Sequence, residues 1–173
     1  MFRFAAKLAF VACVATAIAA IATTAQANLA STRTPVLNQR VLAYATGKFG
    51  KQVGNGECWT LAHDALAFAG ARRPGQDGLR VYEFGRRVAL SPAQIQPGDV
   101  LQFENITFKH TTATSWSTNS FPHHTAIVYR VSGTQITILQ QNVNGDRHVQ
   151  TGVIDLRDLQ PGGSLTLFRP VAR

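Results

Sequence analysis

The stretch that decides the fold runs from residue 54 to residue 62 and reads Gly54-Asn55-Gly56-Glu57-Cys58-Trp59-Thr60-Leu61-Ala62. Two glycines on either side of an asparagine are typical of a tight turn. After this turn, apolar residues recur at helical spacing as far as Ala69, and Gly70 follows as a stop signal. The stretch therefore predicts a glycine turn that leads directly into a helix, with Cys58 at the start of that helix.

The segments around this stretch predict one further helix and then a series of strands. Residues 36–46 have amphipathic helical spacing and end before two glycines. From residue 97 onward, β-branched residues and turn signals predict strands at 100–103, 125–131, 135–139, 148–154 and 165–169. Helices followed by strands indicate an α+β domain, with N-terminal helices packed on an antiparallel β-sheet.

Two segments between these elements leave alternatives open. Residues 71–97 are rich in glycine and proline and are expected to be mostly loop, with Tyr82 and Phe84 in a short strand or a hook. Residues 104–122 are polar and long for a loop in a compact domain, so they form either a functional loop or a hairpin.

The N-terminal residues 1–27 have the features of a secretory signal peptide. Arg3 and Lys7 precede an apolar run that is too short to span a bilayer, and Ala25-Gln26-Ala27 supplies the small residues of a cleavage site. We therefore expect a single mature domain, residues 28–173, that is secreted or periplasmic and has no membrane span after cleavage.

Charge restricts the partners only loosely. The chain carries 17 Lys and Arg against 9 Asp and Glu, and without Arg3 and Lys7 the count is 15 against 9, a net charge of +6. A basic exported protein is attracted to anionic surface polymers, including those of cell walls. The cationic residues never cluster beyond a pair and no nucleic-acid motif occurs, so no nucleic-acid partner is expected.

The cysteine count leaves a buried inert thiol, a cross-link between chains and a reactive thiol open, and the position of Cys58 at a helix start favours the reactive thiol. Of the two cysteines, Cys13 lies in the predicted signal peptide, so the mature chain keeps Cys58 and has no internal disulfide. The unpaired N–H groups and the dipole at a helix start favour an anion, which would lower the pKa of the thiol and supply part of an oxyanion hole. Gln52 is a candidate additional oxyanion donor, and Trp59 either lines the substrate cleft or packs in the core.

Two adjacent histidines supply the candidate base that a thiol nucleophile needs. His123 and His124 stand where the strand expected at 125–131 begins, so either ring projects from a rigid element. If this strand and the next form a hairpin, the alternation of side chains brings Gln140 or Asn142 beside His124. A side-chain amide can accept the imidazole N–H and hold the ring. His124 is therefore the candidate base, and His123 is an alternative base or a substrate contact.

Four blocks of the sequence together resemble a known family. They are Gly56-Glu57-Cys58-Trp59, Pro97-Gly98-Asp99-Val100, His124-Thr125-Ala126-Ile127-Val128 and Gln140-Gln141-Asn142. In this order, within residues 38–145, they resemble the CHAP and NlpC-type branch of the papain-like cysteine peptidases and amidases. In particular they resemble a cysteine-proteinase-fold domain of some fungal and plant proteins that carries a Gly-Glu-Cys-Trp motif. The resemblance implies Cys58 as nucleophile, His124 as base and Asn142 as the asparagine of the family's third block.

One position departs from the family pattern. Gln140 stands where CHAP members usually have a glutamate. An amide can orient the imidazole ring but cannot stabilise an imidazolium by charge, so the third member of the site is either Gln140 or Asn142.

The resemblance implies a hydrolase that cleaves amide bonds by a Cys-His mechanism, with peptides, in particular those of the cell wall (peptidoglycan), as substrate. No cofactor and no metal is expected, because neither Cys-x-x-Cys nor His-Glu-x-x-His spacing occurs. Three alternatives stay open. They are a catalytically inactive binding module on the same fold, which the uncharged Gln140 favours, a metal site built from Cys58, His123 and His124, and another acyl transfer such as transglutamination.

Overall fold

The structure, a computed structural model, describes residues 34–173. The predicted signal peptide, with Cys13 and the cleavage site after Ala27, lies outside the described residues. Within the described residues, no helix is long and apolar enough to cross a membrane.

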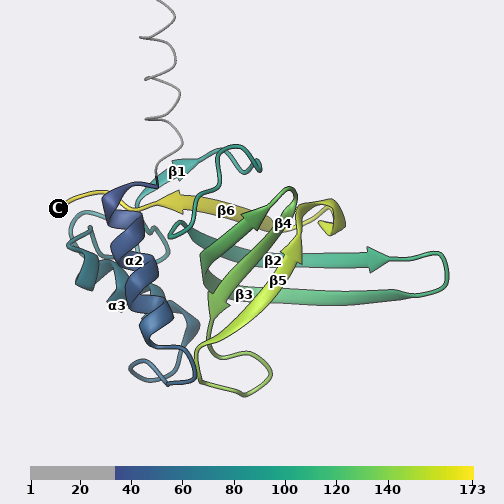
Figure 1. The fold of residues 1–173 in the computed structure, drawn as a ribbon, viewed down its shortest axis with the longest axis horizontal. Helices are drawn as coiled ribbons and strands as arrows, with labels where there is room; N and C mark the ends of the chain where they lie inside the picture. The colour runs from purple at the N-terminus through teal and green to yellow at the C-terminus, as the bar shows by residue number, and fades with distance from the viewer. Residues whose placement is uncertain (1–33) are drawn as a thin grey trace, which may run out of the picture. The chain divides into compact units, whose positions relative to one another are not determined.

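Two helices precede six strands in the described part of the chain. The helices are α2 (Val36–Gly47) and α3 (Cys58–Ala69), and the strands are β1 (Arg86–Val88), β2 (Val100–Thr111), β3 (Trp116–Ser132), β4 (Gln135–Gln140), β5 (Gln150–Asp155) and β6 (Ser164–Arg169), with a short 3-10 helix, η1 (Leu156–Asp158), before β6. The strands form one antiparallel sheet in the order β1-β6-β2-β3-β4-β5, and α2 and α3 lie side by side against it (Figure 1). The predicted α+β fold is confirmed.

Alternation along the strands builds two apolar cores. Toward the helices, the buried strand residues include Val100, Ile127, Leu139 and Phe168, which pack with Leu61 and Leu66 of α3. On the other face, the buried strand residues include Leu101, Ala126, Val128 and Ile138. Residues 124–128 of β3 are all buried, so this part of β3 is held from both faces and is a rigid support for the side chains where it begins.

The polar segment 104–122 is part of a long hairpin. The strands β2 and β3 pair as far as Thr111↔Trp116, and the hairpin extends beyond the rest of the sheet (Figure 1). Phe108 and Phe121 are buried and anchor its base. The outer part consists mainly of Thr, Ser and Asn. These residues do not give the alternation of apolar and polar residues from which a strand is predicted, so the strand was not evident from the sequence.

Of the two forms predicted for Tyr82 and Phe84, the hook is the one that the structure has, and strand β5 starts later than predicted. No strand forms at Tyr82 and Phe84; the chain makes a hook there, closed by the Glu83 N–H donating to the Arg80 carbonyl at 3.1 Å, and β1 follows at Arg86. Strand β5 begins at residue 150 rather than 148, because the segment before it folds back onto the glycine turn at 50–56.

Asp99 is the centre of a buried polar cluster that joins α2 to β6. Its carboxylate accepts a hydrogen bond from the Gln96 N–H at 2.9 Å, as a turn cap would. It also accepts from Asn38 Nδ2 at 2.7 Å and from Arg169 Nε and Nη2 at 3.0 and 2.8 Å. Asp99 is fully buried and the Arg169 side chain is 11% exposed, so water competes little with this ion pair.

Candidate active site

Cys58 is the first residue of α3, as the sequence predicted. The preceding turn depends on Gly54 and Gly56, which have φ angles of 55° and 84°, values that residues with a side chain rarely adopt. A side chain at Gly56 would in addition run into Arg147, which lies against the turn. The turn delivers Cys58 to the helix start in a half-buried position.

The thiol of Cys58 lies against strand β3. Burial raises its pKa above the ordinary value, while the backbone N–H groups of Thr125 and Trp59 lower it in part. The carboxylate of Glu57 raises it further. The prediction that the helix start lowers the pKa of Cys58 is therefore wrong, because desolvation outweighs the N–H groups. At neutral pH Cys58 is therefore mainly a neutral thiol, and its deprotonation would need a base.

Alkylation of Cys58 by iodoacetamide is expected to require alkaline pH. The thiolate is the reactive form, and a pKa raised above the ordinary 9.0 keeps it scarce at neutral pH, so the rate should keep rising through pH 9. In urea, where burial is lost, the same curve should shift to lower pH. The measurement is the alkylation rate against pH by intact mass, in a Cys13→Ser background. A folded protein that reacts fully at pH 6 would contradict this expectation.

His124, the candidate base, is buried near the start of the rigid part of β3. Its ring lies between Phe103 and Phe121, at centroid distances of 5.8 and 5.3 Å. The distance from His124 Nε2 to Gln140 Oε1 is 2.9 Å. Because an amide oxygen only accepts, Nε2 carries the hydrogen and Nδ1 keeps its lone pair. Burial lowers the pKa of His124, and the hydrogen bond that its Nε2–H donates to Gln140 opposes this in part, so the ring is neutral at neutral pH and able to accept a proton.

The geometry separates the two candidates for the third member of the site. The register Ile127↔Leu139 places Gln140 diagonally across from His124, where its amide reaches the ring. Gly152 on β5 has no side chain to fill the space that the Gln140 amide occupies. Asn142 points elsewhere: its Nδ2 donates to Glu57 Oε2 at 2.7 Å. Gln140 therefore orients the imidazole, and Asn142 braces the residue before Cys58.

Gln140→Glu is expected to raise the pKa of His124. A carboxylate beside the ring favours the imidazolium, typically by about one to three pH units. The proton that Cys58 loses then has a better acceptor, so alkylation at pH 7 should accelerate. Histidine NMR titration measures the pKa, with the resonance assigned by loss in His124→Ala. Gln135→Glu adds the same charge at the far end of β4 and should leave His124 unchanged, and an unshifted His124 in Gln140→Glu would refute the assigned contact.

Gln141 is a site residue that sequence reasoning missed. It is fully buried, and its amide accepts from the Val53 N–H at 3.1 Å and donates to the carbonyls of Val53 at 3.1 Å and Glu57 at 2.7 Å. These bonds tie the turn before Cys58 to the end of β4. The only signal in the sequence was the place of Gln141 between Gln140 and Asn142. A side-chain amide at that position does not show which residue, more than 80 positions away, it contacts.

Residues 140–142 and the contact with Thr125 tie Cys58 and His124 to the same two strands, although among the described residues no hydrogen bond joins the Cys58 thiol to the His124 ring. Gln140 holds the His124 ring, Gln141 holds the turn, and the thiol of Cys58 meets the N–H of Thr125, the residue that follows His124. The backbone N–H groups near the sulfur are the donors that an oxyanion at this position would find.

The other three predicted residues have different surroundings. Gln52 is exposed, and its Nε2 donates to the Gly54 carbonyl at 3.1 Å, a contact that does not bring it to the thiol. Trp59 stacks on His63 at 4.7 Å and is half-buried against the helix-side core. His123 projects from the face of β3 opposite to His124, and its Nδ1 lies 2.9 Å from Glu104 Oε2.

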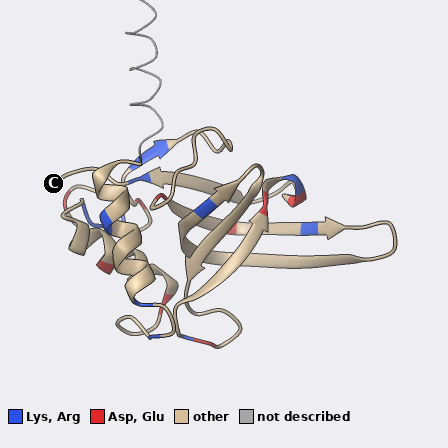
Figure 2. Ribbon diagram, in the orientation of Figure 1, with Lys and Arg blue, Asp and Glu red and all other residues tan. Residues whose placement is uncertain are grey.

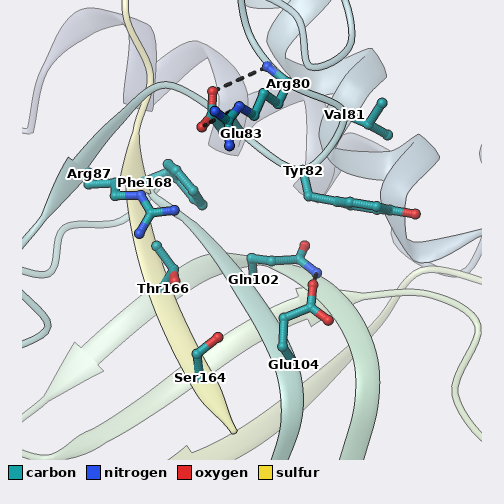
Figure 3. Close-up of a pocket in the computed structure, with 10 residues that line it drawn as sticks. All are labelled: Arg80, Val81, Tyr82, Glu83, Arg87, Gln102, Glu104, Ser164, Thr166 and Phe168. Atoms are coloured by element: carbon teal, nitrogen blue, oxygen red, sulfur yellow. Dashed lines mark hydrogen bonds and ion pairs between the residues drawn. The ribbon is translucent and has the colours of Figure 1, made fainter.

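Two cavities adjoin the candidate active site. One, of about 150 Å³, lies beside His124 and is lined by residues 119–124 and 142–144. The other, of about 390 Å³, lies over β2 and β6 under the hook at residues 80–83 (Figure 3). Among residues 34–173, no group of three or more His, Cys, Asp or Glu side chains is arranged to hold a metal ion.

Comparison with known proteins finds relatives of this chain and of its fold. The family model of the AIM3/BBC1 cysteine proteinase-fold domain matches residues 19–173. Altered inheritance of mitochondria protein 3 of Debaryomyces hansenii is 32% identical over 139 residues, which are 70% of this chain and 15% of that protein. The chain therefore spans only a small part of the length of this relative.

Solved structures with a similar fold include two of Ly7917. The crystal structure of Ly7917 with the hydrolyzing product of MDP matches with a TM-score of 0.50 at 22% identity, over 81% of this chain and 65% of that chain. The other Ly7917 crystal structure matches with a TM-score of 0.49 at 20% identity, over 77% of this chain and 62% of that chain. At this identity the match to the first structure shows the fold alone.

Proposed function

The chain belongs to the AIM3/BBC1 cysteine proteinase-fold domain family, and from this premise we propose that it is a cysteine hydrolase that cleaves amide bonds in cell-wall (peptidoglycan) peptides. Cys58 is the nucleophile, His124 the base and Gln140 the group that orients the base. The observation that carries the proposal is the bond of 2.9 Å between His124 Nε2 and Gln140 Oε1, which leaves Nδ1 free to accept a proton. The nucleophile lies next to the same strand, at the N–H of Thr125.

The proposed reaction begins with a neutral pair. Nδ1 of His124 takes the proton of the Cys58 thiol, and the sulfur attacks the substrate carbonyl. The oxygen that gains the negative charge accepts hydrogen bonds from backbone N–H groups at the start of α3. The imidazolium then protonates the leaving nitrogen as the C–N bond breaks. Water, deprotonated by His124, cleaves the thioester and releases the acid. Gln140 accepts the Nε2 hydrogen throughout and keeps the ring in place.

Three observations support cell-wall peptides as the substrate class. Ly7917, which shares the fold, was crystallised with the hydrolyzing product of MDP. Residues 1–27 carry the signal-peptide features that would export the protein to where such polymers lie. Lys and Arg occur on several elements, among them β1 and the outer part of β2, rather than in one stripe (Figure 2). A spread of positive charge suits diffuse attraction to an anionic polymer.

Incubation with purified peptidoglycan fragments tests the proposal. The expected result is cleavage of an amide bond. It is detected as two products whose masses add up to the mass of the substrate plus one water. Protein alkylated at Cys58 in urea and refolded serves as a matched control, with mock-treated, refolded protein beside it. If neither fragments nor intact peptidoglycan is cleaved across pH 6 to 10, the hydrolase proposal fails.

A binding module on the same fold is the second candidate, and two observations favour it. Gln140 is uncharged, so it cannot stabilise an imidazolium by charge, and burial raises the pKa of Cys58. A binding module would retain peptidoglycan fragments without changing their mass, and Cys58→Ala would retain them equally well. Cosedimentation with insoluble peptidoglycan, followed by mass analysis of the supernatant, distinguishes the two functions.

A further inference from the structure

The larger cavity is built from one face of the sheet and a loop above it. Its floor consists of side chains from three neighbouring strands: Arg87 of β1, Ser164, Thr166 and Phe168 of β6, and Gln102 and Glu104 of β2. The hook at residues 80–83 forms the opposite wall (Figure 3). Its volume of about 390 Å³ is enough for a few amino-acid residues.

A row of cross-strand neighbours links this cavity to the candidate nucleophile. Thr125 of β3 pairs with Gln102 of β2, and Gln102 pairs with Thr166 of β6. The Thr125 hydroxyl also donates to Gln102 Oε1 at 2.6 Å. Neighbouring strands are roughly 4.8 Å apart, so the cavity begins about one strand away from the point where the Cys58 thiol meets β3. An extended peptide advances about 3.3 Å per residue and covers this distance in two residues.

Trp59, the residue after Cys58, holds the hook that forms one wall of the cavity. Trp59 Nε1 donates to the Val81 carbonyl at 2.6 Å, which ties the hook to the start of α3. Tyr82, next in the hook, meets the edge of His123 at a centroid distance of 4.3 Å. The cavity and the start of α3 therefore keep a fixed relative position.

Arg87 is the cation of the cavity lining that has no carboxylate partner in the described part of the chain. Arg80 pairs with Glu83 at 4.0 Å. The Glu104 carboxylate accepts a hydrogen bond from Gln102 Nε2 at 2.9 Å and lies 2.9 Å from His123 Nδ1. Among the described residues, Arg87 has no ion pair; its guanidinium lies over the Phe168 ring, 5.7 Å from the centroid, and points into the cavity (Figure 3). A guanidinium above an aromatic ring still presents a fork of N–H donors that fits a carboxylate.

Resting on the proposed hydrolase function, we propose that this cavity binds a free carboxylate of the peptide substrate, with Arg87 as its anchor. The scissile bond then lies two residues from the anchored group, at Cys58. The site selects peptides that keep a carboxylate at this distance and discriminates against their amidated forms.

The test compares Arg87→Gln with Arg86→Gln. Arg86 is the matched control, because it loses the same charge from the same strand but projects from the other face of β1. The substrates are a peptidoglycan tetrapeptide with free carboxylates and the same tetrapeptide with every carboxylate amidated. For Arg87→Gln the KM of the free acid should rise about ten- to hundredfold, with kcat unchanged and little effect on the amide. Arg87→Lys, which keeps the charge, should recover part of the loss.

Binding to Cys58→Ala separates this inference from the proposed activity, because calorimetry needs no turnover. Binding of the free-acid tetrapeptide that is lost in the double variant Cys58→Ala, Arg87→Gln supports the carboxylate site even if no variant hydrolyses anything. If the wild type hydrolyses acid and amide equally well and Arg87→Gln alters neither KM, the inference is overturned while the hydrolase proposal survives. If the tetrapeptide binds equally with and without Arg87, the inference is likewise overturned.

Discussion

Cys58→Ala should abolish hydrolysis of peptidoglycan fragments, with a fall in kcat of about 10⁴-fold or more. The sulfur forms the bond to the substrate carbonyl in the proposed reaction, and no other described cysteine can replace it. His124→Ala should cause a fall of similar size, because the neutral thiol then has no acceptor for its proton. The double variant should be no slower than either single variant, since the two side chains act as one unit.

The control for the loss of Cys58 is Cys13→Ala, which removes the other cysteine of the sequence and should leave the rate unchanged. Far-UV circular dichroism and thermal unfolding establish that each variant is folded before its rate is compared. Hydrolysis that continues at the wild-type rate in folded Cys58→Ala would assign the activity to another residue.

Asp99→Ala should lower the free energy of unfolding by about 3–5 kcal/mol. The substitution leaves the guanidinium of Arg169 buried without its partner, and it also removes the acceptor of Asn38 in α2. Loss of this cluster loosens the attachment of α2 to β6. Urea denaturation followed by tryptophan fluorescence measures the change.

A surface ion pair provides the comparison for Asp99. The Arg80 side chain is 90% exposed and pairs with Glu83, so Arg80→Ala should change the stability by less than about 1 kcal/mol. An equally small effect for Asp99→Ala would mean that the buried cluster adds little to the stability of the fold.

The parts of the fold in which apolar or β-branched residues follow a regular pattern were predictable from the sequence. Apolar spacing placed α3 after the glycine turn, and β-branched residues marked the inner part of β3. The outer part of the hairpin was not predictable, because Thr, Ser and Asn carry little apolar alternation. Its strand pairing comes from the partner strand and from Phe108 and Phe121 at its base.

The sequence named Cys58, His124 and Gln140 as candidates, but it did not predict their contacts or their electrostatics. Gln140 and Asn142 were equivalent candidates in the sequence, and only the register of β3 against β4 gives Gln140 the contact with His124. The raised pKa of Cys58 follows from tertiary burial, which no local pattern records, whereas the helix start that favours a lower pKa is visible in the motif. Gln141 makes a hydrogen bond to a residue more than 80 positions away, and a single sequence does not show which distant residues are in contact.

The most direct test of the central claim is to trap the acyl group on Cys58. Protein with Cys13→Ser is mixed with excess peptidoglycan tetrapeptide, quenched with acid after milliseconds to seconds, and analysed by intact mass and peptide mapping. The proposed mechanism predicts a thioester on the peptide that contains Cys58, absent in Cys58→Ala and reduced in His124→Ala. Cleavage of the tetrapeptide without any adduct on Cys58 under single-turnover conditions, or no cleavage and no adduct from pH 6 to 10, would contradict it.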